Sequence, residues 1–268
     1  MGQFQLNYMG ARMNEISKYY TPTGSELIEW FYSDDYLSIG GKDSTETLAT
    51  MAGVSQDTSV LDIGSGLGGP AMYIAETRGC KVMGLDIVDS NVKTARSRAK
   101  VRSLQNLVTF QLGDAMDMPF PTDSFNVIIG QDAWSHVPDK DKLISECARV
   151  IELGGTIAFT DWLDIGGMQG DYRASVLDAI GATTLSDQKK YITSLVHHGF
   201  EIVLQEDISA HFKVQYDAVI TRLEGQKERI SERYSPKLYA IVHKKNECIR
   251  RAFSDGMLGG GRIVAKRL

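Results

Sequence analysis

A glycine-rich stretch and a later aspartate carry the clearest chemical signal in this 268-residue sequence. The stretch VLDIGSGLGGPAMYIA, residues 60–75, places Gly64, Gly66 and Gly69 in the spacing G-x-G-x-x-G directly after an apolar run. Glycines at that spacing let the backbone turn tightly and approach a ligand closely. Asp86 ends the next apolar run, where a carboxylate can accept hydrogen bonds from a ribose diol. The pattern predicts a site for a nucleoside-type ligand.

Two further carboxylates help to choose among the ligands that share this fingerprint. Asp62 stands two residues before the first glycine, at the mouth of the loop, where its charge repels pyrophosphate and suits a cationic ligand end. Asp114 ends the third apolar run and can accept from an adenine amino group, while Ala115 and Met116 lie against the ring. These residues favour S-adenosylmethionine. A nicotinamide oxidoreductase, and a module that binds S-adenosylmethionine without turning it over, remain as alternatives.

Composition narrows the class of partner. The net charge of −5, with acidic and basic residues interspersed, gives no footprint for nucleic acid or anionic lipid. The three cysteines, Cys80, Cys147 and Cys248, are odd in number and far apart, which predicts buried free thiols and no metal site. The sequence shows neither a membrane-spanning run nor a signal peptide, so we expect a cytoplasmic protein with a small-molecule substrate, either a monomer or a homodimer.

Short β-branched runs alternate with amphipathic stretches of helical period, which is the order expected of β–α–β units around a parallel sheet. The expected strands are 59–64, 81–87, 108–115, 125–133, 154–162, 201–209 and 261–268. The expected helices are 68–79, 90–104 with Ser90 as its N-cap, 139–152, 187–200, and 236–256 with Ser235 before Pro236. Between residue 161 and the helix at 187–200 we expect a loop-rich segment.

The blocks LDIGSGLGG, GLDI, GDAMDMPF and LGGTIAFTD have the order and spacing of class I S-adenosylmethionine-dependent methyltransferases, which the sequence resembles over residues 60–162. The resemblance implies an α/β fold with a Rossmann-like, doubly wound, seven-stranded sheet and an antiparallel last strand. It also implies S-adenosylmethionine as methyl donor and S-adenosylhomocysteine as product. We expect N-terminal lid helices at 1–45, a methyltransferase core at 46–206 and 257–268, and a helical cap insertion at 207–256.

A second resemblance concerns the segment KYYTPTGSELIEWFYSDDYLSIGG at 18–41, which looks like the lid of small-amine N-methyltransferases. Those enzymes act on sarcosine/dimethylglycine or on phosphoethanolamine. They share YT-x-x-G, Y-x-S-x-GG and QDA-x-x-H-x-PD, which are matched here at 20–24, 36–41 and 131–139. The resemblance implies methylation of the nitrogen of a small polar amine. Few residues after the fifth strand can hold a phosphate, so O- or C-methylation of a natural-product or other small acceptor is the alternative.

Displacement of an activated methyl group requires an aligned nucleophile and a place for its proton. We expect His136 to act as base, Asp132 to attract a cationic nitrogen, and Tyr20 to hydrogen-bond His136 while closing the lid. The residues expected to bind the donor are Tyr20, Leu37, Ser38, Asp62, Gly64, Ser65, Gly66, Asp86, Ile87, Asn91, Asp114, Ala115 and Gln131. Those expected to bind the acceptor are Tyr19, Asp132, Trp162, Tyr172, Arg173 and Tyr216.

Overall fold

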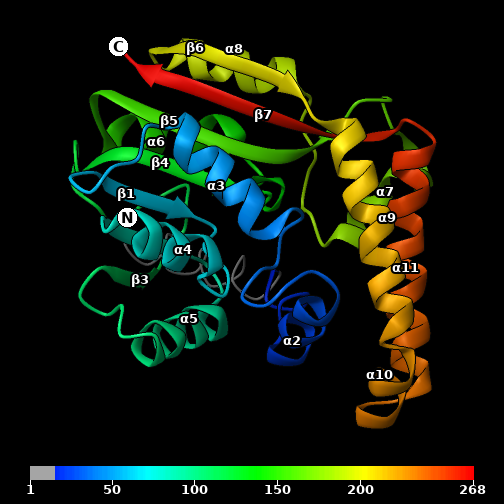
Figure 1. The fold of residues 1–268 in the computed structure, drawn as a ribbon. Coiled ribbons are helices and arrows are strands. Elements are labelled where there is room, and N and C mark those ends of the chain that lie inside the picture. The colour runs from blue at the N-terminus through cyan, green and yellow to red at the C-terminus, as the bar shows by residue number, and fades with distance from the viewer. Residues whose placement is uncertain (1–15) are drawn as a thin grey trace, which may run out of the picture.

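Seven strands form one sheet in the computed structural model, which describes residues 16–268. Their order is β3–β2–β1–β4–β5–β7–β6, and β7 runs antiparallel to both neighbours (Figure 1). The strands are β1 (Ser59–Ile63), β2 (Lys81–Asp86), β3 (Val108–Leu112), β4 (Phe125–Gln131), β5 (Ile151–Asp164), β6 (Phe200–Asp207) and β7 (Leu258–Arg267). The expected α/β fold, with its antiparallel last strand, is confirmed. Residues 1–15 of the expected lid lie outside the described residues.

Helices pack on both faces of the sheet, because each buries apolar side chains at helical spacing. The helices on one face are α3 (Gly41–Met51), α4 (Gly69–Arg78) and α5 (Asp89–Val101), and those on the other are α6 (Lys140–Val150) and α8 (Gln188–His197). The side chains of Asp139 and Asp187 cap α6 and α8 by accepting hydrogen bonds from first-turn N–H groups. Because β1 to β5 pair in parallel, their carboxyl ends lie at one edge of the sheet.

The start of α5 differs from the expected one. The helix begins at Asp89 with Val88 as its N-cap, so Ser90 lies inside the first turn and does not cap it. The reason is local, since Asp86 Oδ1 accepts a hydrogen bond from the Val88 N–H at 2.8 Å. That contact turns the chain into the helix directly after β2.

Other segments also differ from the expected ones. The segment expected to be loop-rich contains α7 (Gly170–Ile180), in which Val176 alone is fully buried, so its apolar pattern is weak. Strand β5 begins at Ile151, earlier than expected, because a register shift against β4 between Phe125 and Val127 accommodates the additional residues. Tertiary pairing thus extends the strand through two glycines.

Three helices stand between β6 and β7. They are α9 (Ser209–Gly225), α10 (Lys227–Arg233) and α11 (Pro236–Ser254). Helices α9 and α11 lie side by side and project from the edge of the sheet (Figure 1). As expected, Ser235 caps α11, its Oγ accepting from the Leu238 N–H at 3.1 Å. Helix α2 (Pro22–Phe31), from the lid segment, packs against α9.

Two further observations concern the cysteine thiols and the apolar content of the helices. All three thiols are free, and Cys80 and Cys147 are buried, whereas Cys248 is only half-buried. Within residues 16–268 no helix combines the length and the apolar content needed to cross a bilayer.

Candidate active site

A cavity opens where the loops after β1, β2, β3 and β4 meet. Including its mouth it encloses about 840 Å³, and small-molecule sites usually have ~300–1,000 Å³. Except for Asp62, every residue expected to bind the donor lines this cavity. Its position beside β1 and β4 is the topological switch point of the sheet, where doubly wound folds usually bind ligands.

The glycine loop after β1 forms one wall of the cavity. It carries no side chain where it comes closest to the end of β4. Gly64 has φ +80°, a left-handed conformation, and a Cβ placed there would lie 2.4 Å from the Cβ of Ala133. The N–H groups of Gly64 and Ser65 donate to Leu85 O at 2.8 and 3.1 Å. The loop therefore fits between the ends of β2 and β4 only while residue 64 is glycine.

Asp86 ties the end of β2 to this loop. Its Oδ2 accepts from the Gly66 N–H at 2.8 Å, and its Oδ1 accepts from the Val88 N–H. Burial raises the pKa of Asp86 to about 6, and these backbone donors partly offset that rise. Each carboxylate oxygen has a second lone pair, so the side chain keeps capacity for a hydroxyl group of a ligand.

Asp62 lies beneath the glycine loop and not at its mouth, where the sequence placed it. The side chain is fully buried and absent from the cavity wall, and it contacts the Ala71 N–H without forming a well-aligned hydrogen bond. Burial, followed by the nearby charge of Asp86, raises the pKa of Asp62 to about 7, and the Ala71 contact partly offsets that rise. Its charge therefore acts on the cavity through the loop backbone, without contact.

This buried carboxyl should make stability depend on pH. Because the folded-state pKa of Asp62 lies above its unfolded value, the folded protein takes up a proton between pH 8 and 6 that the unfolded chain does not. Lowering the pH over that window therefore stabilises the fold. We expect Asp62→Asn to reduce this gain by about 1 kcal/mol, measured by urea unfolding at both pH values. Equal pH dependence in the variant and the wild type would contradict the assignment.

Tyr20 and His136 form a hydrogen-bonded pair in the cavity wall. The Tyr20 hydroxyl lies 2.8 Å from His136 Nε2, and His136 Nδ1 lies 2.9 Å from the Gly181 carbonyl oxygen. A carbonyl can only accept, so Nδ1 carries the proton and Tyr20 donates to Nε2. Burial lowers the pKa of His136 to about 4 and raises that of Tyr20. Both side chains are neutral at neutral pH.

Asp132 joins the cavity to the lid. Its φ is +55°, and its two oxygens accept from the Ile39 N–H at 3.0 Å and the Thr160 hydroxyl at 2.6 Å. Burial first, and then Asp161, raises the pKa of Asp132 to about 7. Both carboxylate oxygens are thus already engaged in holding the lid turn against the ends of β4 and β5.

The neighbouring residue, Gln131, makes a second connection to the same turn. Its Nε2 donates to Ser38 Oγ at 2.9 Å and to the Gly41 carbonyl at 3.1 Å, while its Oε1 accepts from Thr45. Ser38 lines the cavity, so the end of β4 fixes part of the wall that the lid contributes. Gln131 lines the cavity, but its amide is committed to the lid.

Comparison with known proteins finds a methyltransferase domain that contains much of this site. Residues 61–159, which contain the glycine loop, Asp86, Asp114 and the Tyr20 partner His136, match the model of a family described as a methyltransferase domain. The chain is an S-adenosylmethionine-dependent methyltransferase. The match spans β1 to the middle of β5.

Individual relatives of this methyltransferase differ in their acceptors. It is 28% identical over 222 residues to phosphoethanolamine N-methyltransferase of Plasmodium falciparum, covering 82% of each chain. It is 28% identical over 237 residues to 27-O-demethylrifamycin SV methyltransferase of Amycolatopsis mediterranei, covering 87% of this chain and 86% of that one. A solved phosphoethanolamine N-methyltransferase 2 of Haemonchus contortus shares the fold, with TM-score 0.88 at 23% identity, covering 96% of this chain but only 60% of that one.

Five residues of the methyltransferase that were expected to bind the acceptor do not line the cavity. Trp162 and Tyr216 are buried and pack against each other and against Phe253 of α11. Tyr172 donates to Asp255 at 3.4 Å. The sequence alone does not show that these aromatic rings pack against the inserted helices, because that contact depends on the tertiary fold.

The other two have partners outside the cavity. Arg173 pairs with Asp164 and donates to the Leu185 carbonyl at 3.2 Å, because α7 turns its side chain back to the end of β5. Tyr19 is 36% exposed and donates to Asp178 at 3.3 Å. Neither contact brings the side chain to the methyltransferase cavity.

Some lining residues of the methyltransferase were not anticipated. They are Ile16, Asp35, Ile63, Leu67, Pro70, Leu85, Val88, Gly113, Ala133, Trp134 and Val137, whereas Asp132 and His136, expected to act in catalysis, also line it. Asp35 had a signal in the sequence, since it precedes the Y-x-S-x-GG block directly. Trp134 likewise lies within the QDA-x-x-H-x-PD block, in the short 3-10 helix Trp134–His136.

Proposed function

We propose that this methyltransferase transfers a methyl group to the nitrogen of a small polar amine held beside His136. The observation that supports it most directly is the Tyr20–His136 hydrogen bond in the wall of the same cavity that Asp86 and Asp114 line. A proton acceptor and a nucleoside site in one cavity suit a transfer that needs orientation and proton removal. The phosphoethanolamine N-methyltransferase relative agrees with an amine acceptor.

The residues present fit the methyl donor. Asp86 would accept from the ribose hydroxyls and Asp114 from the adenine amino group, while the side-chain-free backbone of Gly64 and Gly66 leaves room for the methionine part. S-adenosylmethionine supplies a methyl group on a positively charged sulfonium. Asp62 is buried behind the loop, and a cationic ligand in the cavity would favour its charged form.

The Tyr20–His136 pair would handle the proton of the acceptor. A protonated amine donates to the Tyr20 hydroxyl while Tyr20 passes its own proton to His136 Nε2, leaving a neutral nitrogen lone pair and an imidazolium. The Gly181 carbonyl at Nδ1 stabilises that imidazolium and fixes the ring. Gln131 and Asp132 hold the lid turn closed and so exclude water from the cavity.

The charges in the cavity wall affect which acceptor can bind. Among the described residues that line the cavity there is no lysine or arginine, and Arg98 and Arg102 already balance the charge of Asp35 from outside it; the other acidic side chains of the wall are Asp86, Asp114 and Asp132. A phosphate group would therefore meet acidic side chains without a positively charged partner among these lining residues, which is costly in a partly buried site. The wall therefore favours an amine without phosphate, such as one of the sarcosine/dimethylglycine type.

A panel of acceptors tests this proposal. We expect kcat/KM for sarcosine or dimethylglycine to exceed that for phosphoethanolamine by about tenfold or more, which corresponds to ~1.4 kcal/mol of transition-state stabilisation. Initial rates of S-adenosylhomocysteine formation with each acceptor provide the measurement. Phosphoethanolamine as the best acceptor, or no transfer to any amine, would refute the proposed specificity.

One second candidate is O-methylation, which the rifamycin-type relative favours. A neutral His136 can also accept the proton of a hydroxyl group through Tyr20. Including a hydroxylated acceptor in the same panel separates the two reactions, because only one class of acceptor should produce S-adenosylhomocysteine at a rate above the background.

A further inference from the structure

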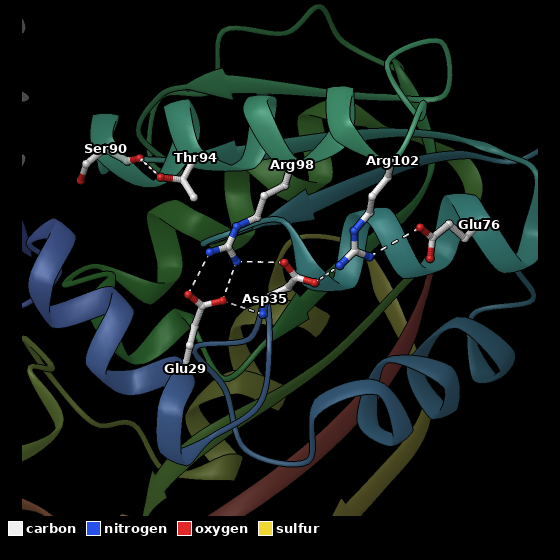
Figure 2. A network of polar contacts seen from close by, with 7 residues as sticks. All are labelled: Glu29, Asp35, Glu76, Ser90, Thr94, Arg98 and Arg102. Atoms are coloured by element: carbon white, nitrogen blue, oxygen red, sulfur yellow. Dashed lines mark hydrogen bonds and ion pairs between the residues drawn. The ribbon is translucent and has the colours of Figure 1, made fainter. Parts of the chain in front are cut away.

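Two acidic residues of the lid segment converge on Arg98 of α5 and on Arg102, the C-cap residue of that helix (Figure 2). Arg98 donates from Nη2 to Glu29 Oε2 at 2.9 Å and from Nη1 to Asp35 Oδ1 at 2.9 Å. Arg102 donates to the other carboxylate oxygen of Asp35 and reaches Glu76 of α4 at 3.5 Å. Arg98 thus bridges both acidic residues, and Asp35 in turn bridges both arginines.

These contacts are better shielded from water than an ordinary surface ion pair. The side chains of Glu29 and Asp35 are 12% and 9% exposed, and Arg98 is 29% exposed. Arg98 also contacts both oxygens of Glu29, a forked geometry that strengthens guanidinium–carboxylate pairs. Such a pair contributes more than an exposed one, although it remains sensitive to salt.

The network fixes the backbone of the lid turn as well as its side chains. The Asp35 N–H donates to Glu29 Oε1 at 2.7 Å, and Asp35 has φ +71°, a conformation that non-glycine residues rarely adopt. The turn that follows supplies Leu37 and Ser38 to the cavity wall, and Asp35 itself lines it. The ion pairs therefore hold part of the wall in place.

Helix α5 connects the same network to the donor site. Asn91, near its N-terminus, lines the cavity, and Asn91 Oδ1 accepts from Ser25 Oγ of α2 at 3.0 Å. The lid is thus attached to one side of α5 by a buried hydrogen bond and by the arginines about two and three turns further along. Movement of the lid away from α5 would open the cavity at this wall.

We propose that Glu29, Asp35, Arg98 and Arg102 form an ionic latch that positions the lid turn and sets how long the donor and its product stay bound. This inference rests on the proposed placement of the donor in the cavity. Without the Arg98 guanidinium, the adjacent Glu29 and Asp35 carboxylates lose their shared counter-charge and repel one another. The lid turn then leaves the wall more often, and the bound nucleoside escapes faster.

The experiment measures release of S-adenosylhomocysteine from the full chain by stopped-flow, using the fluorescence of Trp134 in the cavity wall. For Arg98→Met we expect release about tenfold faster than wild type at low salt. Raising the salt from about 0.05 M to about 0.5 M should accelerate wild-type release and leave the variant nearly unchanged. A purely structural role would not remove the salt dependence.

Matched variants complete the test. Lys93→Met removes the exposed Lys93–Asp89 pair from the same helix and should release product at the wild-type rate. Glu29→Gln should accelerate release as Arg98→Met does, and the two changes together should add little to either. Wild-type release rates and salt dependence in both single variants overturn the latch while leaving donor binding intact. A wild-type protein that binds no S-adenosylhomocysteine overturns the latch and the proposed function together.

Discussion

Replacing His136 with alanine should lower kcat for methyl transfer by about 100- to 1,000-fold, the usual contribution of a positioned proton acceptor. Donor affinity should stay within about twofold of the wild-type value, because the donor contacts proposed for Asp86 and Asp114 remain. The physical reason is that Nε2 is the acceptor for the Tyr20 hydroxyl, so its loss leaves the acceptor proton without a destination. Single-turnover rates and titration with S-adenosylhomocysteine measure the two quantities separately.

Further variants of His136 and Tyr20, with a control, make this experiment more specific. Asparagine can still donate to the Gly181 carbonyl from the position of Nδ1 but has no atom at the position of Nε2 to accept from Tyr20, so His136→Asn should be as slow as His136→Ala. Tyr20→Phe should also be slow, and the double variant should be no slower than either single variant. His198→Ala is the control, since that histidine pairs with Asp141 outside the cavity. Unchanged turnover in His136→Ala would remove the residue from the mechanism.

Gly64→Ala should weaken binding of the donor by about 100-fold and lower the free energy of unfolding by about 2–4 kcal/mol. Two effects combine at this position. The left-handed φ of +80° costs an alanine about 1–2 kcal/mol, and the new Cβ would lie 2.4 Å from the Cβ of Ala133. The loop or the end of β4 must shift, and both form the cavity wall. Calorimetric titration with S-adenosylhomocysteine and urea unfolding measure these effects.

Replacing a second glycine separates the effect of backbone strain from that of the close Cβ contact. Gly53 has φ +68°, and a Cβ there would meet nothing within 4 Å. Gly53→Ala should therefore cost only the strain of the left-handed backbone, about 1–2 kcal/mol, and leave donor affinity unchanged. If Gly64→Ala bound the donor as tightly as Gly53→Ala, the close approach of the loop to β4 would have no functional importance.

Much of the core was predictable from local patterns. The strands that end at Ile63, Asp86 and Gln131 are short, apolar and punctuated by glycine or aspartate, so their positions follow from residue type alone. Parallel pairing then brings their carboxyl ends together, which is why Asp86 and Asp114 both line the cavity. The Tyr20–His136 contact was predictable only by resemblance, because it joins residues far apart in the sequence.

Other features depend on packing that the sequence does not encode locally. Asp132 was expected to face a substrate nitrogen, yet its oxygens accept from Ile39 and Thr160. Asp62 has the right spacing for a loop-mouth charge, but it belongs to β1, which is buried on both faces from Val60 to Ile63. In the same way, no local pattern indicates that Trp162 packs on α9 and α11 and not on a ligand.

The helices inserted between β6 and β7 have a consequence for how the chain folds. These two strands pair as antiparallel neighbours although residues 208–257 separate them. Closing so long a loop carries an entropic penalty that grows with the logarithm of its length. Because α9 and α11 lie side by side, their pairing holds the loop ends close together in the folded chain. A helical hairpin remote from the chemistry thereby offsets part of the entropic penalty of completing the sheet.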